Sequence, residues 1–77
     1  MTELETMLKK LTNILENSVE DLKITDARII NSIMFLTFFY PDESEEDAVF
    51  LTFNEWNKLT TFELSVVIIE KIHSIYK

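Results

Sequence analysis

The sequence predicts a small α+β domain in the order helix, strand, strand, helix, with two helices covering an antiparallel hairpin. Three observations predict it. Apolar residues recur at helical spacing over 2–22, a β-branched and aromatic segment fills 28–40, and a capping box precedes a second helical stretch near the C-terminus. At 77 residues, the chain is a single domain, 1–77, near the size at which one core supplies only a few kcal/mol of net stability.

The first helix is predicted from Thr2 to Leu22. Thr2 and Glu5 have the spacing of a capping box, in which each residue accepts a backbone hydrogen bond near the other. A short heptad seam can also be read here, but a helix that packs on a sheet explains the pattern better. Residues 23–27 are then a connection. The apolar positions of this helix are Leu4, Met7, Leu8, Leu11, Ile14, Leu15, Val19 and Leu22.

The segment 28–40 is predicted as a strand, because β-branched and aromatic residues dominate it. Its second half is apolar on both faces, although a strand of a two-layer domain is normally apolar on one. Either both faces are covered or one of them is an intermolecular surface. A bend at Asn31 and Ser32 would instead split the segment into two strands, and the fold would then be a three-stranded meander with two helices.

Pro41 ends this strand, since proline lacks the N–H that a ladder requires. The acidic segment 42–47 is a loop, and 48–53 returns as an antiparallel strand because the link is too short for a parallel crossover. Asn54 is predicted to cap a helical turn over 55–59. Thr60 begins the last helix, which extends to Tyr76.

A lone hairpin provides little sheet, and the doubly apolar strand needs a second cover. Both observations predict a homodimer, in which copies meet edge to edge or face to face. The residues predicted for self-association are Met34, Leu36, Phe38, Tyr40 and Trp56.

The composition excludes several classes of protein. The chain has no cysteine, which excludes disulfides and thiolate chemistry, and no glycine, which excludes the phosphate-binding loops that nucleotide enzymes use. With a net charge of −7 and seven scattered basic residues, direct nucleic-acid binding is not expected. No apolar run is long enough to span a bilayer, and Glu3 and Glu5 replace the basic start of a signal peptide. We expect a cytoplasmic protein that has no membrane association and needs no cofactor.

Negative charge is concentrated in the 42–47 loop. Five of these six residues are acidic, and without them the formal charge changes from −7 to −2. A calcium loop is not predicted, because the required glycine turn and closing glutamate are missing. A second acidic group, with Glu16, Glu20, Asp21 and Asp26, lies at the end of the first helix. If the two groups meet, they form a negative patch for a basic protein. The predicted partner-binding residues are Asp42, Glu43, Glu45, Glu46, Asp47, Glu16, Glu20 and Asp21.

No catalytic constellation is visible, and we predict that the protein is not an enzyme. His73, the one histidine, has no nucleophile or orienting group at a suggestive spacing. A short, acidic, cysteine-free chain without catalytic motifs is similar in general character to phage-encoded inhibitors, including anti-CRISPR and DNA-mimic proteins. The expected function is therefore inhibition or regulation of a basic, nucleic-acid-handling protein. The alternative is a structural module that acts as a homodimer.

Overall fold

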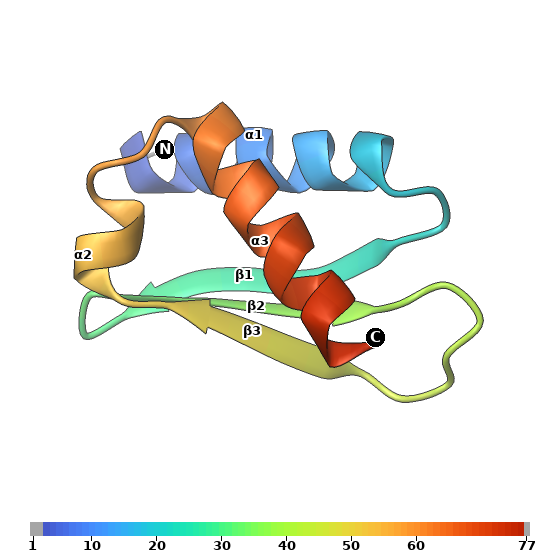
Figure 1. The fold of residues 1–77 in the computed structure, drawn as a ribbon. Helices are drawn as coiled ribbons and strands as arrows, with labels where there is room; N and C mark the ends of the chain where they lie inside the picture. The colour runs from blue at the N-terminus through green and yellow to red at the C-terminus, as the bar shows by residue number, and fades with distance from the viewer. Residues whose placement is uncertain (1–2, 77) are drawn as a thin grey trace.

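The computed structural model describes residues 3–76 and has two layers (Figure 1). One layer is a three-stranded antiparallel sheet in the order β1-β2-β3. The other contains helices α1 and α3, which lie across one face of that sheet and leave its opposite face uncovered. The short helix α2 lies at one end. The predicted α+β class is confirmed, in its three-stranded form.

Helix α1 spans Glu3–Ser18 and ends four residues before the predicted Leu22. The predicted cap Thr2 lies outside the described residues. Asp21 has a φ of 64° and leaves the helical conformation, a region that Asp enters more readily than most residues. Val19 and Leu22 still pack on the core. The apolar spacing therefore identified most of the residues that face the core, although Leu4 is exposed, and it overestimated the length of the helix.

Strand β1 spans Lys23–Ile30, so the prediction of a connection over 23–27 was wrong. A bulge between Ile24 and Asp26 interrupts the pairing with β2, and it disrupts the alternation by which a strand is recognised in sequence. The next turn contains Asn31 and Ser32, with φ of 51° and 66°. Two successive positive φ values are typical of a tight hairpin turn, so 28–40 forms two strands.

Strand β2, Ile33–Phe39, is central, and β3, Asp47–Leu51, pairs with its other side. Met34, Leu36 and Phe38 of β2 have no exposed surface, because they point toward the helices. Their assignment to self-association was therefore wrong for the folded chain, since these side chains lie inside it. Tyr40 is half-buried and Trp56 is buried in the same core, so the assignment of Trp56 needs the same correction.

Two capping boxes fix the C-terminal helices. Helix α2, Phe53–Trp56, begins after Thr52 rather than after the predicted Asn54, and Thr52 donates its N–H to Glu55 at 3.0 Å. Helix α3, Thr61–Ile75, begins after Thr60 as predicted, with reciprocal bonds between Thr60 and Glu63. These boxes satisfy backbone donors that a helix start leaves without partners.

The core lies between the sheet and the two long helices. Twelve apolar side chains form it, and every layer contributes to it. They are Leu11, Leu15, Leu22, Met34, Leu36, Phe38, Val49, Leu51, Trp56, Leu64, Ile68 and Ile72. Among the described residues, no helix has both the length and the apolar character needed to cross a membrane.

Candidate functional site

Except for Asp26, which lies within β1, the two acidic groups predicted from the sequence lie at the same end of the molecule (Figure 1). Lys23, the first residue of β1, pairs with Phe39, the last residue of β2. The segment that leads into β1 and the loop that follows β2 therefore emerge at the same end of the sheet. We call this end, with all eight predicted partner-binding residues, the acidic end. It contains Glu16, Glu20, Asp21, Asp42, Glu43, Glu45, Glu46 and Asp47.

The loop begins with a tight turn that needs no glycine. The Glu43 N–H donates to the Tyr40 carbonyl at 3.0 Å. Pro41 occupies the second position, where its fixed φ is favourable, and Asp42 occupies the third with a φ of 68°. The turn directs the chain away from the sheet, and Asp42 to Glu46 are all exposed.

Two of the five loop acids have structural partners. Glu46 accepts a hydrogen bond from the Thr25 hydroxyl of β1, and Asp47 accepts one from the Tyr76 hydroxyl after α3. The bond to Asp47 raises the pKa of Tyr76 to about 12, since the neutral phenol is the donor. Tyr76 also stacks on Tyr40, with ring centroids 4.1 Å apart. The loop is thus held at its base by both layers.

Two further acids bind the backbone of β1, which is an edge strand. Glu16 of α1 accepts the Ile24 N–H at 3.0 Å, and Asp26 accepts the Ala27 N–H at 2.9 Å. Backbone donors on an edge strand otherwise attract a further strand. Glu16 and Asp26 therefore stabilise the edge of the sheet in addition to any part in binding.

The remaining acids are available to a partner. Asp42, Glu43, Glu45, Glu20 and Asp21 are exposed, and the structure gives their side chains no hydrogen bond or ion pair with the described residues. Within 3–76, no group of three His, Asp or Glu side chains is arranged to hold a metal ion. The arrangement suits long-range attraction of a positive surface, because dense like charge at one end creates a directed field.

His73 lies beside the base of this loop. Its ring is edge-on to Tyr40, with centroids 6.4 Å apart, and it is exposed on α3. Tyr40 in turn stacks on Tyr76, whose hydroxyl donates to Asp47. The His73 ring contacts this group through Tyr40.

A second surface is the face of the sheet that the helices leave uncovered, which the sequence predicted as one of two alternatives but with the wrong residues. We call it the open face. Phe35 and Phe50 lie next to each other on it, with ring centroids 6.3 Å apart, and Phe50 is 58% exposed. The doubly apolar pattern of 33–39 indicated such a surface, but it could not show which set of residues would face the helices.

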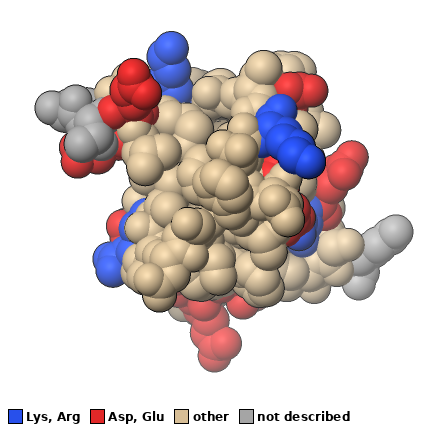
Figure 2. Space-filling model, turned by 90° about the vertical axis from the view of Figure 1, so that its left-hand side faces the viewer, with Lys and Arg blue, Asp and Glu red and all other residues tan. Residues whose placement is uncertain are grey.

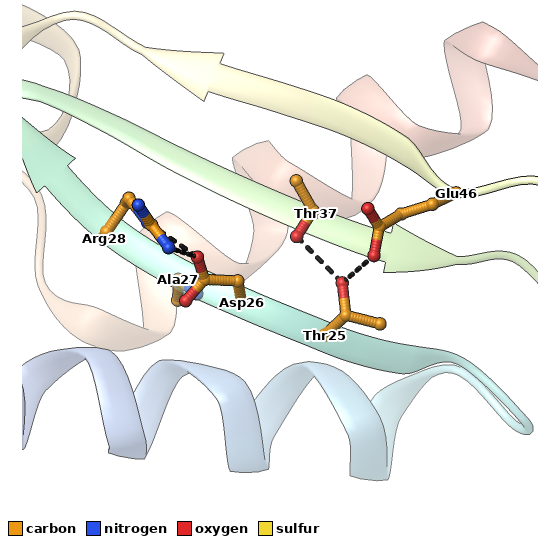
Figure 3. A network of polar contacts seen from close by, with 6 residues as sticks. All are labelled: Thr25, Asp26, Ala27, Arg28, Thr37 and Glu46. Carbon is orange, nitrogen blue, oxygen red and sulfur yellow. Dashed lines mark hydrogen bonds and ion pairs between the residues drawn. The ribbon is translucent and has the colours of Figure 1, made fainter.

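Polar groups flank the aromatic pair on the open face. Figure 3 shows that Thr25, Thr37 and Glu46 come from three adjacent segments and point toward one another. The Thr25 and Thr37 hydroxyls are 2.8 Å apart. On the same strand as Thr25, the Arg28 guanidinium pairs with the Asp26 carboxylate. A shallow depression of about 380 Å³ lies among these residues and Phe35.

The end opposite the acidic end has a different character. It contains α2, the β1–β2 turn and the start of α1 (Figure 1). Figure 2 shows this end in front, and most of its surface is neither acidic nor basic, with charged side chains mainly toward the rim. The long axis of the molecule, 33 Å, thus separates a strongly charged end from a weakly charged one.

The chain was compared with protein-family models, with curated proteins and with solved structures. None of the three comparisons gives a match. The function of the site therefore has to be argued from its geometry and charge.

Proposed function

We propose that the protein is a non-enzymatic binding module whose acidic end docks on a basic surface of another protein and occludes it. One observation carries the proposal: the fold brings eight acidic residues, separated by up to 31 positions in sequence, to a single end of the molecule. An acidic loop alone serves as a solubilising turn. Two acidic segments at one end create a field that attracts a complementary surface.

Some of these acids have hydrogen bonds within the protein and the others are exposed, and this difference supports the proposal. Glu16, Glu46 and Asp47 bind the protein's own backbone or hydroxyl groups, and they hold the loop and the edge of the sheet in place. The acids between and beside them point into solvent. A partner would therefore meet charges on a fixed base, which reduces the ordering cost of binding.

The partner class follows from the same chemistry. Basic surfaces that bind the phosphates of nucleic acids recognise closely spaced negative charges. The acidic end gathers eight carboxylates at one end of the molecule, so a nucleic-acid-handling protein is the expected target. Occupation of its basic surface would inhibit or regulate it, as in the anti-CRISPR and DNA-mimic proteins whose general character this chain resembles. No cofactor is required for such a role.

The experiment compares two variants with equal loss of charge. Glu43→Gln/Glu45→Gln removes two charges from the acidic end, and Glu3→Gln/Glu70→Gln removes two charges elsewhere. Each protein is immobilised and used to capture proteins from its host, and capture is quantified by mass spectrometry at rising salt. We expect a basic protein that the wild type and the Glu3/Glu70 variant retain and that the Glu43/Glu45 variant loses. Its retention should fall as salt shortens the screening length to about 8 Å at 0.15 M.

The control separates local charge from net charge. If both variants lose the partner equally, overall charge alone explains the capture and the acidic end has no special role. If the captured proteins are the same for all three forms, the proposal is wrong. A competition experiment with the purified partner then tests the mimicry of DNA. The protein should displace a DNA duplex from the partner through its acidic end.

A second function is favoured by a separate observation, the open face with its aromatic pair. The uncovered sheet surface is the feature expected of a structural or oligomerisation module that acts as a homodimer. This function does not require the acidic end. The two candidate functions can therefore be tested independently.

A further inference from the structure

We infer that the open face binds a second copy of this chain in a face-to-face dimer. The two-fold axis of this dimer runs parallel to the sheet and across its strands, at the level of Leu36. This inference deepens the second candidate function, the homodimer, and rests on it, but it does not depend on the acidic end. It rests on the pattern of side chains across the open face, which is complementary to itself under that one symmetry operation.

Two neighbouring rows of residues cross the open face. Arg28, Phe35 and Phe50 are paired across the three strands and form the first row. Asp26, Thr37 and Ala48 are paired in the same way and form the second. Residues opposite each other in antiparallel strands point to the same face. The rows lie two residues apart, which is about 7 Å along a strand.

A two-fold axis that runs between these rows brings the first row of one copy opposite the second row of its partner, and the second row opposite the partner's first. Arg28 then faces Asp26, so the ion pair within each chain joins its symmetry mate in a network of four charges. Each large ring faces a small side chain, with Phe35 over Thr37 and Phe50 over Ala48. Large side chains against small ones allow two sheets to interdigitate at about 10 Å.

The outer positions of the central strand also match under this axis, whereas on β1 it brings Ile30, the partner of Ile33, opposite Lys23, the partner of Phe39. Ile33 precedes the first row by two residues, and Phe39 follows the second row by two. The axis places these two apolar side chains opposite each other. The four alternate positions of β2 are therefore complementary to the same positions read in the opposite direction, as an isologous interface requires. These positions are Ile33, Phe35, Thr37 and Phe39.

The sheet side of the molecule sets an upper limit to the size of this interface. The molecule measures 33 by 22 by 20 Å, so the rectangle that encloses this side is on the order of 700 Å², and the three strands fill only part of it. A typical specific interface buries about 800 Å² on each partner, so this dimer has a small interface. The axis also reverses the strands of the second copy, which places the two acidic ends at opposite ends of the dimer and keeps their charges apart.

Edge-to-edge pairing through β1 is a poorer route to a dimer. Two backbone donors of that strand, at Ile24 and Ala27, are already bound by Glu16 and Asp26. A second strand would have to displace both carboxylates. The open face needs no such displacement, because Phe50 is exposed and the Arg28–Asp26 pair can accept further charged neighbours.

The first test uses matched phenylalanines. Phe50 lies on the open face and is 58% exposed, whereas Phe62 lies on α3 and is 69% exposed. We expect the wild type and Phe62→Asp to have twice the monomer mass of 9.1 kDa by light scattering at micromolar concentration. Phe50→Asp should raise the dimer Kd by at least about tenfold, since a charge in an apolar interface is strongly unfavourable. A monomeric wild type, a dimeric Phe50→Asp or equal loss in both variants would overturn the inference.

The second test depends on the facing of Arg28 and Asp26. Arg28→Asp leaves two acids on each copy, and Asp26→Arg leaves two bases, so each variant alone should be monomeric through repulsion. A one-to-one mixture should form a heterodimer, because each acid then faces a base. A mixture that stays monomeric while both variants keep the wild-type circular dichroism spectrum would rule out this axis. If Asp26→Arg does not fold, the phenylalanine comparison decides the question.

Discussion

Replacement of Trp56 by Phe tests whether this side chain stabilises the monomer by joining α2 to the β1–β2 turn, a role that we call the clamp. Trp56 packs edge-on against Phe53, with centroids 5.2 Å apart, and its indole N–H donates to the Ser32 carbonyl at 2.8 Å. It thereby joins α2 to the β1–β2 turn, where Asn31 and Ser32 adopt positive φ. The two residues that this hydrogen bond joins are 24 positions apart in sequence.

The magnitude follows from two losses. The hydrogen bond contributes about 1 kcal/mol, and the smaller ring leaves a void that costs about 1 kcal/mol more. A domain of this size has an unfolding free energy of about 4–12 kcal/mol. A loss of about 2 kcal/mol should therefore lower the Tm by about 8–16 °C.

Thermal and urea unfolding followed by circular dichroism measure this change, because the substitution removes the chain's one tryptophan fluorophore. Phe62→Leu, an equally conservative change at an exposed ring, is the control and should change the unfolding free energy by less than about 0.5 kcal/mol. A Trp56→Phe protein with unchanged Tm but weakened self-association would refute the clamp, because Trp56 would then act at an interface.

Three further changes test local features. The pKa of Tyr76 in the folded protein, about 12, lies above the ordinary value of 10.0. The hydrogen bond to Asp47 therefore stabilises the fold fully below pH 10, and this stabilisation is lost as the pH rises toward 12. In urea titrations, the unfolding free energy of Tyr76→Phe should decrease less between pH 10 and pH 12 than that of the wild type. Thr60→Ala should lower the Tm by about 4–8 °C in calorimetry, because a helix cap is worth about 1 kcal/mol; an unchanged Tm would mean that the Thr60–Glu63 box is not formed. Ser32→Gly should raise the unfolding free energy by roughly 0.5–1 kcal/mol in urea, since glycine tolerates positive φ; destabilisation would contradict the left-handed turn.

The prediction of the fold from sequence succeeded where chemistry is local and failed where the backbone is irregular. The Thr60–Glu63 spacing located the start of α3 correctly, because a capping box involves only four successive residues. The first part of β1, residues 23–27, was missed because it is largely polar and a bulge breaks its alternation between Ile24 and Asp26. The sequence predicts the β1–β2 turn only as one of two alternatives, because Asn31 and Ser32 form it without the usual glycine.

The candidate site was predictable in part for similar reasons. Loop acids that are contiguous in sequence are necessarily close in space, but the proximity of Asp21 to that loop depends on the pairing of Lys23 with Phe39. The choice between the two faces of β2 could not be made from sequence. Both Phe35 and Leu36 are apolar, and only the position of the helices decides that Leu36 is buried.

The location of the acids at a narrow end of the molecule has a consequence for the lifetime of any complex. The cross-section there is on the order of 400 Å², from extents of 22 and 20 Å. This is about half of what each side of a long-lived specific complex buries. A single copy that docks end-on should therefore bind quickly and dissociate quickly. Prolonged occupancy of a target would require that the partner wrap around the sides of the protein, or that two linked copies bind neighbouring sites at once.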